Sequence, residues 1–144
     1  MEPRNPNWAA RCRQSFDGQG VMGTFGVTVA DLLPGKVTLQ MPFRSDLTQQ
    51  HGFLHAGVVT TVLDSACGYA AFTLMPETAE VLTVEFKSNF LAPAKGTIFR
   101  FEGEVIKAGR TLMVTQGRAL GDDVLISTMQ ATMMVVEGRE GINA

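Results

Sequence analysis

The chain has 144 residues, of which 45% are hydrophobic and 18% are charged. This length fits one domain whose core needs no metal or disulfide for stability. Twelve Lys and Arg against 14 Asp and Glu leave no basic excess, so we expect no nucleic-acid partner. Charged residues make up about a quarter of an average domain, and their shortage here suggests that a second copy of the chain covers part of the surface.

The cysteines and the apolar segments indicate where the protein resides. Cys12 and Cys67 lie far apart, outside any metal-ligand spacing, so we expect reduced thiols, no metal site and a cytoplasmic protein. Residues 47–76 contain a single charged side chain, that of Asp64. Because this aspartate would be costly in lipid and several polar residues surround it, we interpret the segment as a buried helix and expect no membrane insertion.

The first half of the chain predicts one helix and two strands. Trp8, Cys12 and Phe16 recur every four residues, which predicts an amphipathic helix over about 6–17. The glycines that follow are expected to end it. Two alternating runs, 27–32 and 36–41, flank a Leu-Pro-Gly turn and predict a hairpin.

The second half predicts a long helix followed by four strands. The apolar segment gives a central helix over about 56–75, and two-residue periodicity then predicts strands near 82–90, 97–107, 111–120 and 124–136. In the first of these strands the alternation places Thr83 on a polar face. The order predicts a single α+β domain over 1–144, with an antiparallel sheet wrapped around the central helix.

One dense polar cluster stands at the start of the central helix. Gln49 and both histidines of the chain lie just before it, and Asp64 lies within it. In the structural interpretation His55 caps the helix, Gly57 permits close packing and neighbours satisfy Asp64. In the functional interpretation the desolvation cost of Asp64 is tolerated because a site needs its carboxylate.

Helix geometry adds a prediction about assembly. If the helix begins near Ala56, its free N–H groups and positive dipole end suit a developing oxyanion. Asp64 follows eight residues later, about 12 Å along the axis at about 1.5 Å per residue. One helix cannot aim both groups at one carbonyl, whereas two antiparallel copies can. The spacing therefore predicts a homodimer with composite sites, or a dimer of dimers.

These residues resemble a known family. His55-Ala56-Gly57, Asp64 on the next helix, Thr83 on the following strand and Pro93-Ala94 after it are similar to the PaaI-type acyl-CoA thioesterases of the hotdog-fold superfamily. The resemblance extends from about residue 35 to 136. Family members show His-Gly-Gly, and alanine replaces the first glycine here.

The resemblance implies roles for five residues. Asp64 corresponds to the catalytic carboxylate, which acts as general base on water or as nucleophile on the thioester. Ala56 stands where a backbone N–H polarises the carbonyl. Gln49 and Thr83 match positions that orient the water or the acyl group, and His55 matches one that positions the helix start. The implied reaction converts an acyl-CoA to free acid and coenzyme A, with no metal and no cofactor other than the coenzyme A of the substrate.

Further substrate contacts are expected from residues near these positions. Tyr69 and Phe72 are candidates for an acyl pocket or for core packing, and the basic side chains are candidates for the coenzyme A phosphates or are solvated charges. The candidate substrate-binding residues are Gly57, Tyr69, Phe72, Lys87, Lys107 and Arg110.

Two alternative functions remain at this stage. A hotdog hydratase or dehydratase would use other motif settings, which the sequence lacks. A non-catalytic hotdog protein that binds acyl-CoA or fatty acid would keep the apolar pocket without turnover.

Overall fold

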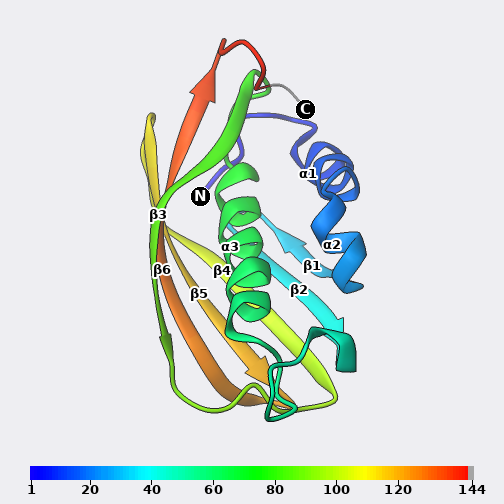
Figure 1. Cartoon of the computed structure of the whole chain (residues 1–144). Helices are drawn as coiled ribbons and strands as arrows, with labels where there is room; N and C mark the ends of the chain where they lie inside the picture. The colour runs from blue at the N-terminus through cyan, green and yellow to red at the C-terminus, as the bar shows by residue number, and fades with distance from the viewer. Residues whose placement is uncertain (143–144) are drawn as a thin grey trace.

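The computed structural model describes residues 1–142 as one curved sheet with helices on its concave side (Figure 1). The sheet is fully antiparallel, with strand order β1-β2-β4-β5-β6-β3. The helices are α1 (Trp8–Asp17), α2 (Gly20–Phe25), the short 3-10 helix η1 (Ser45–Leu47) and α3 (Ala56–Phe72). The strands are β1 (Thr28–Leu33), β2 (Lys36–Pro42), β3 (Ala79–Phe90), β4 (Ile98–Ala108), β5 (Leu112–Gly121) and β6 (Val124–Glu137). The α+β class and the sheet wrapped around a central helix are confirmed.

Helix α3 lies close to the sheet because two glycines lie beneath it. Gly103 of β4 and Gly117 of β5 are direct partners in the sheet. A Cβ atom at residue 103 would overlap the carbonyl oxygen of Ala66, and one at residue 117 would lie 2.8 Å from Leu63 Cδ1. The missing side chains therefore set the depth at which α3 sits.

The polar residues of α3 are satisfied within the structure. Thr60 and Thr61 donate to the carbonyl oxygens one turn earlier, each at 2.8 Å, so these hydroxyls need no water. After Phe72 the helix ends in a turn, and the Thr73 hydroxyl accepts from Gly35 N–H at 2.7 Å. This bond ties the end of α3 to the β1–β2 turn. Over residues 1–142, none of the helices is both long and apolar enough to cross a bilayer.

The N-terminal segment contains one helix more than the sequence indicated. Cys12 and Phe16 of α1 are buried in the core, as their spacing predicted. The glycine-rich segment after α1 was expected to be non-helical, but it forms α2, in which Met22 is 1% exposed. Burial of this methionine outweighs the poor helix propensity of the glycines.

A β-bulge in β3 corrects the predicted strand faces. The register to β6 shifts between Thr83 and Glu85, so Thr83 lies opposite Met133 and Phe86 lies opposite Ala131. Both of these β6 residues are fully buried on the concave side. The extra residue, Val84, therefore turns Thr83 toward α3. The prediction that Thr83 shares a polar face with Glu85 and Lys87 was wrong for this reason.

The contact under α3 yields a stability prediction. Gly103→Ala should destabilise the fold by about 1–3 kcal/mol, because α3 must move away from the sheet. Gly23→Ala in α2 is the control, since a Cβ there meets nothing within 4 Å and helix propensity favours alanine. Urea denaturation measures both. Equal stability of Gly103→Ala and the wild type would contradict the close contact.

Candidate active site

His55 shapes the start of α3. Its Nδ1 accepts a hydrogen bond from the Gly57 N–H at 2.8 Å, and its carbonyl oxygen accepts from Val58 and Val59. The imidazole therefore acts as an N-cap in its neutral form, with the proton on Nε2. A Cβ at residue 57 would lie 3.0 Å from Nδ1, so glycine gives the ring room. The Gly57 N–H, a candidate substrate contact, is occupied by this cap.

The cap leaves one backbone donor at the helix start. Among residues 1–142, no acceptor contacts the Ala56 N–H, whereas the next three N–H groups all have partners. This free N–H lies at the positive end of the α3 dipole, where negative charge is stabilised. The backbone conformation of His55, with φ −60° and ψ 139°, directs the chain into the helix at this point.

Gln49 is fixed by the loop that precedes the helix. Its Oε1 accepts from His51 N–H at 2.5 Å and from Phe53 N–H at 3.4 Å. With the carbonyl of the side chain engaged, the amide NH2 is the group left to bind a ligand, and it can only donate. Gln49 is therefore oriented as a hydrogen-bond donor.

These residues line one hollow, which we call the helix-start hollow. It measures about 310 Å³, and its walls come from the loop before α3 and from the end of β3 with the following loop. Leu54 N–H donates to Ala94 O at 3.1 Å and joins the two walls. The lining residues are Gln49, Gln50, Phe53, Leu54, His55, Ala56, Phe90, Ala92, Pro93 and Ala94.

Asp64 and Thr83 meet in a second hollow, the carboxylate hollow. Thr83 Oγ1 donates to Asp64 Oδ1 at 2.8 Å, a contact that the bulge at Val84 makes possible. Burial raises the pKa of Asp64 above 3.8, and the hydrogen bond from Thr83 opposes this rise. The hollow measures about 170 Å³ and is lined by Ser15, Gln19, Asp64, Ser65, Gly68, Tyr69, Glu80, Val81 and Thr83.

Within one chain the two hollows are separate. They have no lining residue in common, and Asp64 follows Ala56 by about 12 Å along α3. The structure thus brings Gln49, His55 and Ala56 together in one place and Asp64 and Thr83 in another.

The remaining candidates lie in different environments. Tyr69 lines the carboxylate hollow. Phe72 is buried in the core against Tyr69, and the centroids of these two rings are 6.2 Å apart. Lys87 is exposed on β3. Lys107 lies nine residues beyond Ile98 in β4, about 30 Å from the helix-start end of the sheet, and Arg110 follows in the next turn.

Across residues 1–142, the His, Cys, Asp and Glu side chains form no group of three that could hold a metal ion.

The family of the chain follows from its sequence. The sequence profile of the thioesterase superfamily matches residues 51–126, more than half of the chain. The chain belongs to the thioesterase superfamily. The matched region contains His55, Ala56, Asp64 and Thr83, and the expected activity of a thioester hydrolase is confirmed.

Three relatives illustrate the range of similarity of this thioesterase. A thioesterase family protein from Silicibacter pomeroyi is 57% identical, with a TM-score of 0.88 over 91% of this chain and 99% of that one. Human acyl-coenzyme A thioesterase 13 is 29% identical over 62% of this chain and 64% of its own. The Escherichia coli PaaI protein has a TM-score of 0.85 at 12% identity, over 94% of this chain and 97% of that one, and so shares the fold. The predicted hotdog-fold family is confirmed.

Sequence reasoning did not identify several residues around Asp64. Ser15 and Gln19 come from the N-terminal segment, and Glu80 comes from the start of β3. No motif links these positions, because only the packing of the N-terminal segment and of β3 against α3 brings them together. Ser65, which also lines this hollow, is the residue after Asp64 in the chain.

The Asp64–Thr83 contact predicts a pKa difference. In Thr83→Val the hydrogen bond that lowers the pKa of Asp64 is lost, so this pKa should rise above its wild-type value, itself above 3.8. Thr83→Ser keeps a hydroxyl and should titrate like the wild type. Carboxyl-carbon NMR of Asp64 measures each value, and an equal pKa in Thr83→Val and the wild type would contradict the assignment.

Proposed function

We propose that this thioesterase hydrolyses an acyl-CoA to a free carboxylic acid and coenzyme A. One observation carries the proposal: helix α3 bears both a half-buried carboxylate and a free backbone donor. The carboxylate of Asp64 pairs with Thr83 in a hollow, and the start of the helix presents the free Ala56 N–H. A carboxylate and an oxyanion donor are the two groups that thioester hydrolysis requires.

The proposed site is shared between two copies of the chain. Strand β3 is an edge strand, and its concave-side residues Phe86 and Phe90 are 43% and 48% exposed. An exposed apolar edge strand favours pairing with another strand. Two copies that pair along β3 about a two-fold axis place their α3 helices side by side and antiparallel. The helix start of one copy then lies beside Asp64 of the other.

The chemistry follows from these positions. The thioester carbonyl oxygen accepts from the Ala56 N–H of one copy, and its developing charge is stabilised by the α3 dipole. Asp64 of the other copy takes a proton from a water molecule, and the water oxygen attacks the carbonyl carbon. The Gln49 NH2 donates a hydrogen bond to this water oxygen. The tetrahedral intermediate expels the coenzyme A thiolate, which takes up the proton from Asp64. With Asp64 as nucleophile, its carboxylate oxygen attacks the carbonyl carbon and displaces the coenzyme A thiolate to give a mixed anhydride. Water then hydrolyses this anhydride to the free carboxylic acid and the Asp64 carboxylate, and the proton that is left over goes to the thiolate.

The substrate supplies coenzyme A, and the proposed reaction uses no other cofactor. Lys87, Lys107 and Arg110 stay candidates for its phosphates. Cys12 and Cys67 are unpaired and buried, and burial raises the pKa of each thiol to about 12. Such unreactive thiols suit the reducing cytoplasm, where we place the protein.

Replacement of the carboxylate tests the proposed function. Asp64→Asn keeps the acceptor for Thr83 but removes the base, so kcat should fall by about 10²–10⁴-fold. Thiol release from short, medium, long and aryl acyl-CoAs measures the loss. Unchanged hydrolysis would overturn the role of Asp64.

Thermal unfolding of the same variant provides the control for folding. Because burial raises the pKa of Asp64, the ionised carboxylate costs the folded state stability at neutral pH, and this cost is absent below pH 3.8. Asp64→Asn should therefore melt at a higher temperature than the wild type near neutral pH and at the same temperature in acid. A lower Tm at neutral pH would point to misfolding as the cause of lost activity.

A further inference from the structure

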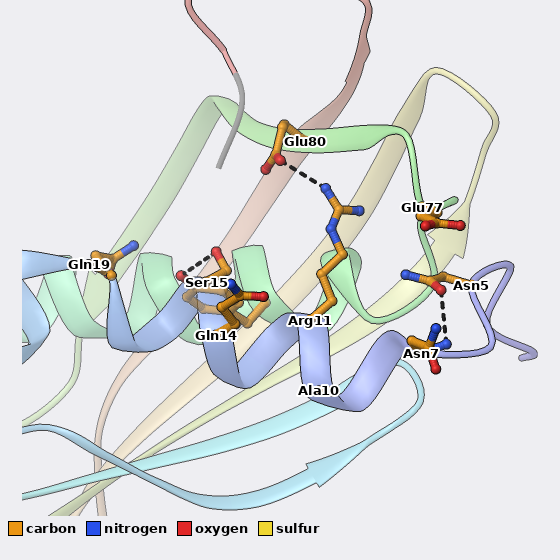
Figure 2. A pocket seen from close by; sticks show the side chains of 11 residues that line it. Asn5, Asn7, Ala10, Arg11, Gln14, Ser15, Gln19, Glu77 and Glu80 are labelled. Carbon is orange, nitrogen blue, oxygen red and sulfur yellow. Dashed lines mark hydrogen bonds and ion pairs between the residues drawn. The ribbon is translucent and has the colours of Figure 1, made fainter.

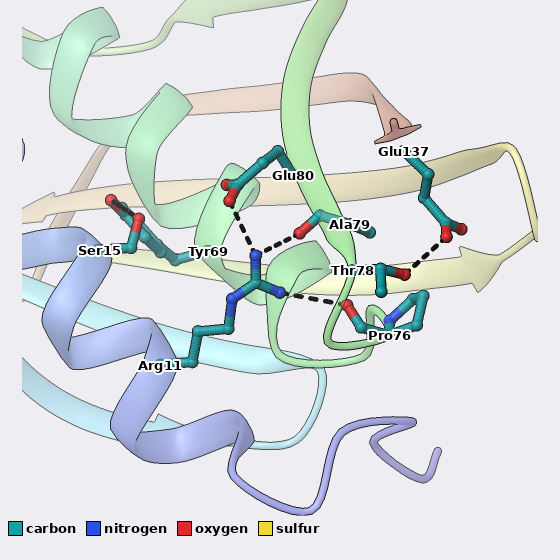
Figure 3. Close-up of polar contacts among 8 residues, drawn as sticks. All are labelled: Arg11, Ser15, Tyr69, Pro76, Thr78, Ala79, Glu80 and Glu137. Atoms are coloured by element: carbon teal, nitrogen blue, oxygen red, sulfur yellow. Dashed lines mark hydrogen bonds and ion pairs between the residues drawn. The ribbon is translucent and has the colours of Figure 1, made fainter. Parts of the chain in front are cut away.

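The edge of β3 is open over only part of its length. Arg11 of α1 donates to the carbonyl oxygen of Ala79, the first residue of β3, and forms an ion pair with Glu80 at 2.8 Å (Figure 3). A hollow of about 810 Å³ lies between α1, α3 and this start of the strand (Figure 2). The exposed part of the strand begins at Leu82, so residues 82–90 are the stretch that is open to a second copy.

Opposite charges flank the middle of this open stretch. Phe86 lies opposite the buried Ala131 and faces the concave side, so its neighbours Glu85 and Lys87 face the convex side. The Thr132 hydroxyl donates to Glu85 Oε1 at 2.6 Å, which leaves Oε2 as a further acceptor. Within residues 1–142 neither Glu85 nor Lys87 forms an ion pair.

The two faces of the strand restrict how two copies of β3 can pair. Residues directly opposite in an antiparallel pair lie on the same face, so a two-fold axis passes through a residue and not between two. An axis at Glu85 or at Lys87 places like charges opposite each other, which is unfavourable. An axis at Ser88 gives neither charge an opposite partner. An axis at Phe86, the midpoint of residues 82–90, places Glu85 of each copy opposite Lys87 of the other.

The register centred on Phe86 also brings the two half-sites together. Phe90 lines the helix-start hollow and follows Phe86 by four residues, whereas Thr83 lines the carboxylate hollow and precedes Phe86 by three. In this register Phe90 of one copy lies about one residue step, or about 3.4 Å, from Thr83 of the other. With the axis at Ser88 the same residues are about three steps apart. The charges and the site geometry therefore favour the same register.

We propose that two copies of the chain pair along β3 with Phe86 on the two-fold axis, and that ion pairs between Glu85 and Lys87 set this register. The inference rests on the shared site of the proposed function and specifies how the second copy is recognised. A neighbouring register would move Asp64 by about 7 Å relative to the Ala56 N–H of the other copy, two residue steps along the strand. Lys87 then serves assembly in place of the coenzyme A phosphates.

Single cysteines test the register directly. In Phe86→Cys the two new thiols lie opposite each other, with Cα atoms about 5 Å apart, which allows a disulfide. In the matched control Ser88→Cys they are four residue steps apart, about 13 Å, which is too far. Cys12 and Cys67 are buried. After oxidation with diamide, non-reducing electrophoresis should show a cross-linked dimer for Phe86→Cys alone. Cross-linking of Ser88→Cys, or of neither variant, would overturn the register.

Exchange of the two charges tests the ion pairs. Glu85→Lys and Lys87→Glu each place like charges opposite each other twice, so the dissociation constant of the dimer should rise by about tenfold or more. The double variant Glu85→Lys/Lys87→Glu restores opposite charges and should dimerise nearly as tightly as the wild type. Sedimentation equilibrium measures all four proteins. A double variant as weak as the single variants would contradict the role of the ion pairs.

The register and the proposed reaction can fail separately. Wild-type hydrolysis of an acyl-CoA without cross-linking of Phe86→Cys would overturn the register and leave the reaction in place. A cross-linked Phe86→Cys dimer together with a wild-type protein that hydrolyses no acyl-CoA would overturn the proposed function and support the register.

Discussion

The close contact between α3 and the glycines of the sheet determines the geometry of the site. Gly103 and Gly117 let the helix backbone approach β4 and β5, with Leu63, Ala66 and Cys67 against them. Asp64 belongs to this same helical turn, so the depth of the helix also fixes the height of its carboxylate. The hydrogen bond to Thr83 at the sheet edge then holds the carboxylate in place. Core packing and the position of the Asp64 carboxylate thus depend on the same contact.

The separation of the two hollows assigns the edge strand β3 a role in the proposed shared site. In the proposed reaction, a chain with the oxyanion donor at the helix start and the carboxylate near the middle of the helix has two half-sites. Pairing along β3 would join them and would also cover Phe86 and Phe90. The low charge content of residues 47–76 fits the proposed dimer, in which the helix would serve as core, as neighbour of the second copy and as support for the carboxylate.

Most of the fold could be predicted from the sequence, since several strands carry a two-residue alternation and α3 is a largely apolar segment with a single charged residue. The sequence did not reveal the bulge at Val84, because a strand with a bulge has the same kinds of residues as a regular strand. The position of the bulge is determined by the pairing of β3 with β6. The helix α2 was hidden because glycine-rich segments favour turns until tertiary packing buries Met22. Asp64 was recognisable as a lone charge in an apolar helix. Ser15 and Gln19 approach it only through the packing of the N-terminal segment, which no local pattern specifies.

The shared site is tested most directly by mixing two inactive variants. Asp64→Asn removes the carboxylate, and Ala56→Pro removes the free N–H at a first helical position, where proline is tolerated. In a mixed dimer one site carries both changes and the other carries neither. Refolding equal amounts together should therefore restore about a quarter of wild-type hydrolysis, since about half of the dimers are mixed and each has one intact site. If the mixture stays as inactive as the separate variants, each site is built within one chain and the account is wrong.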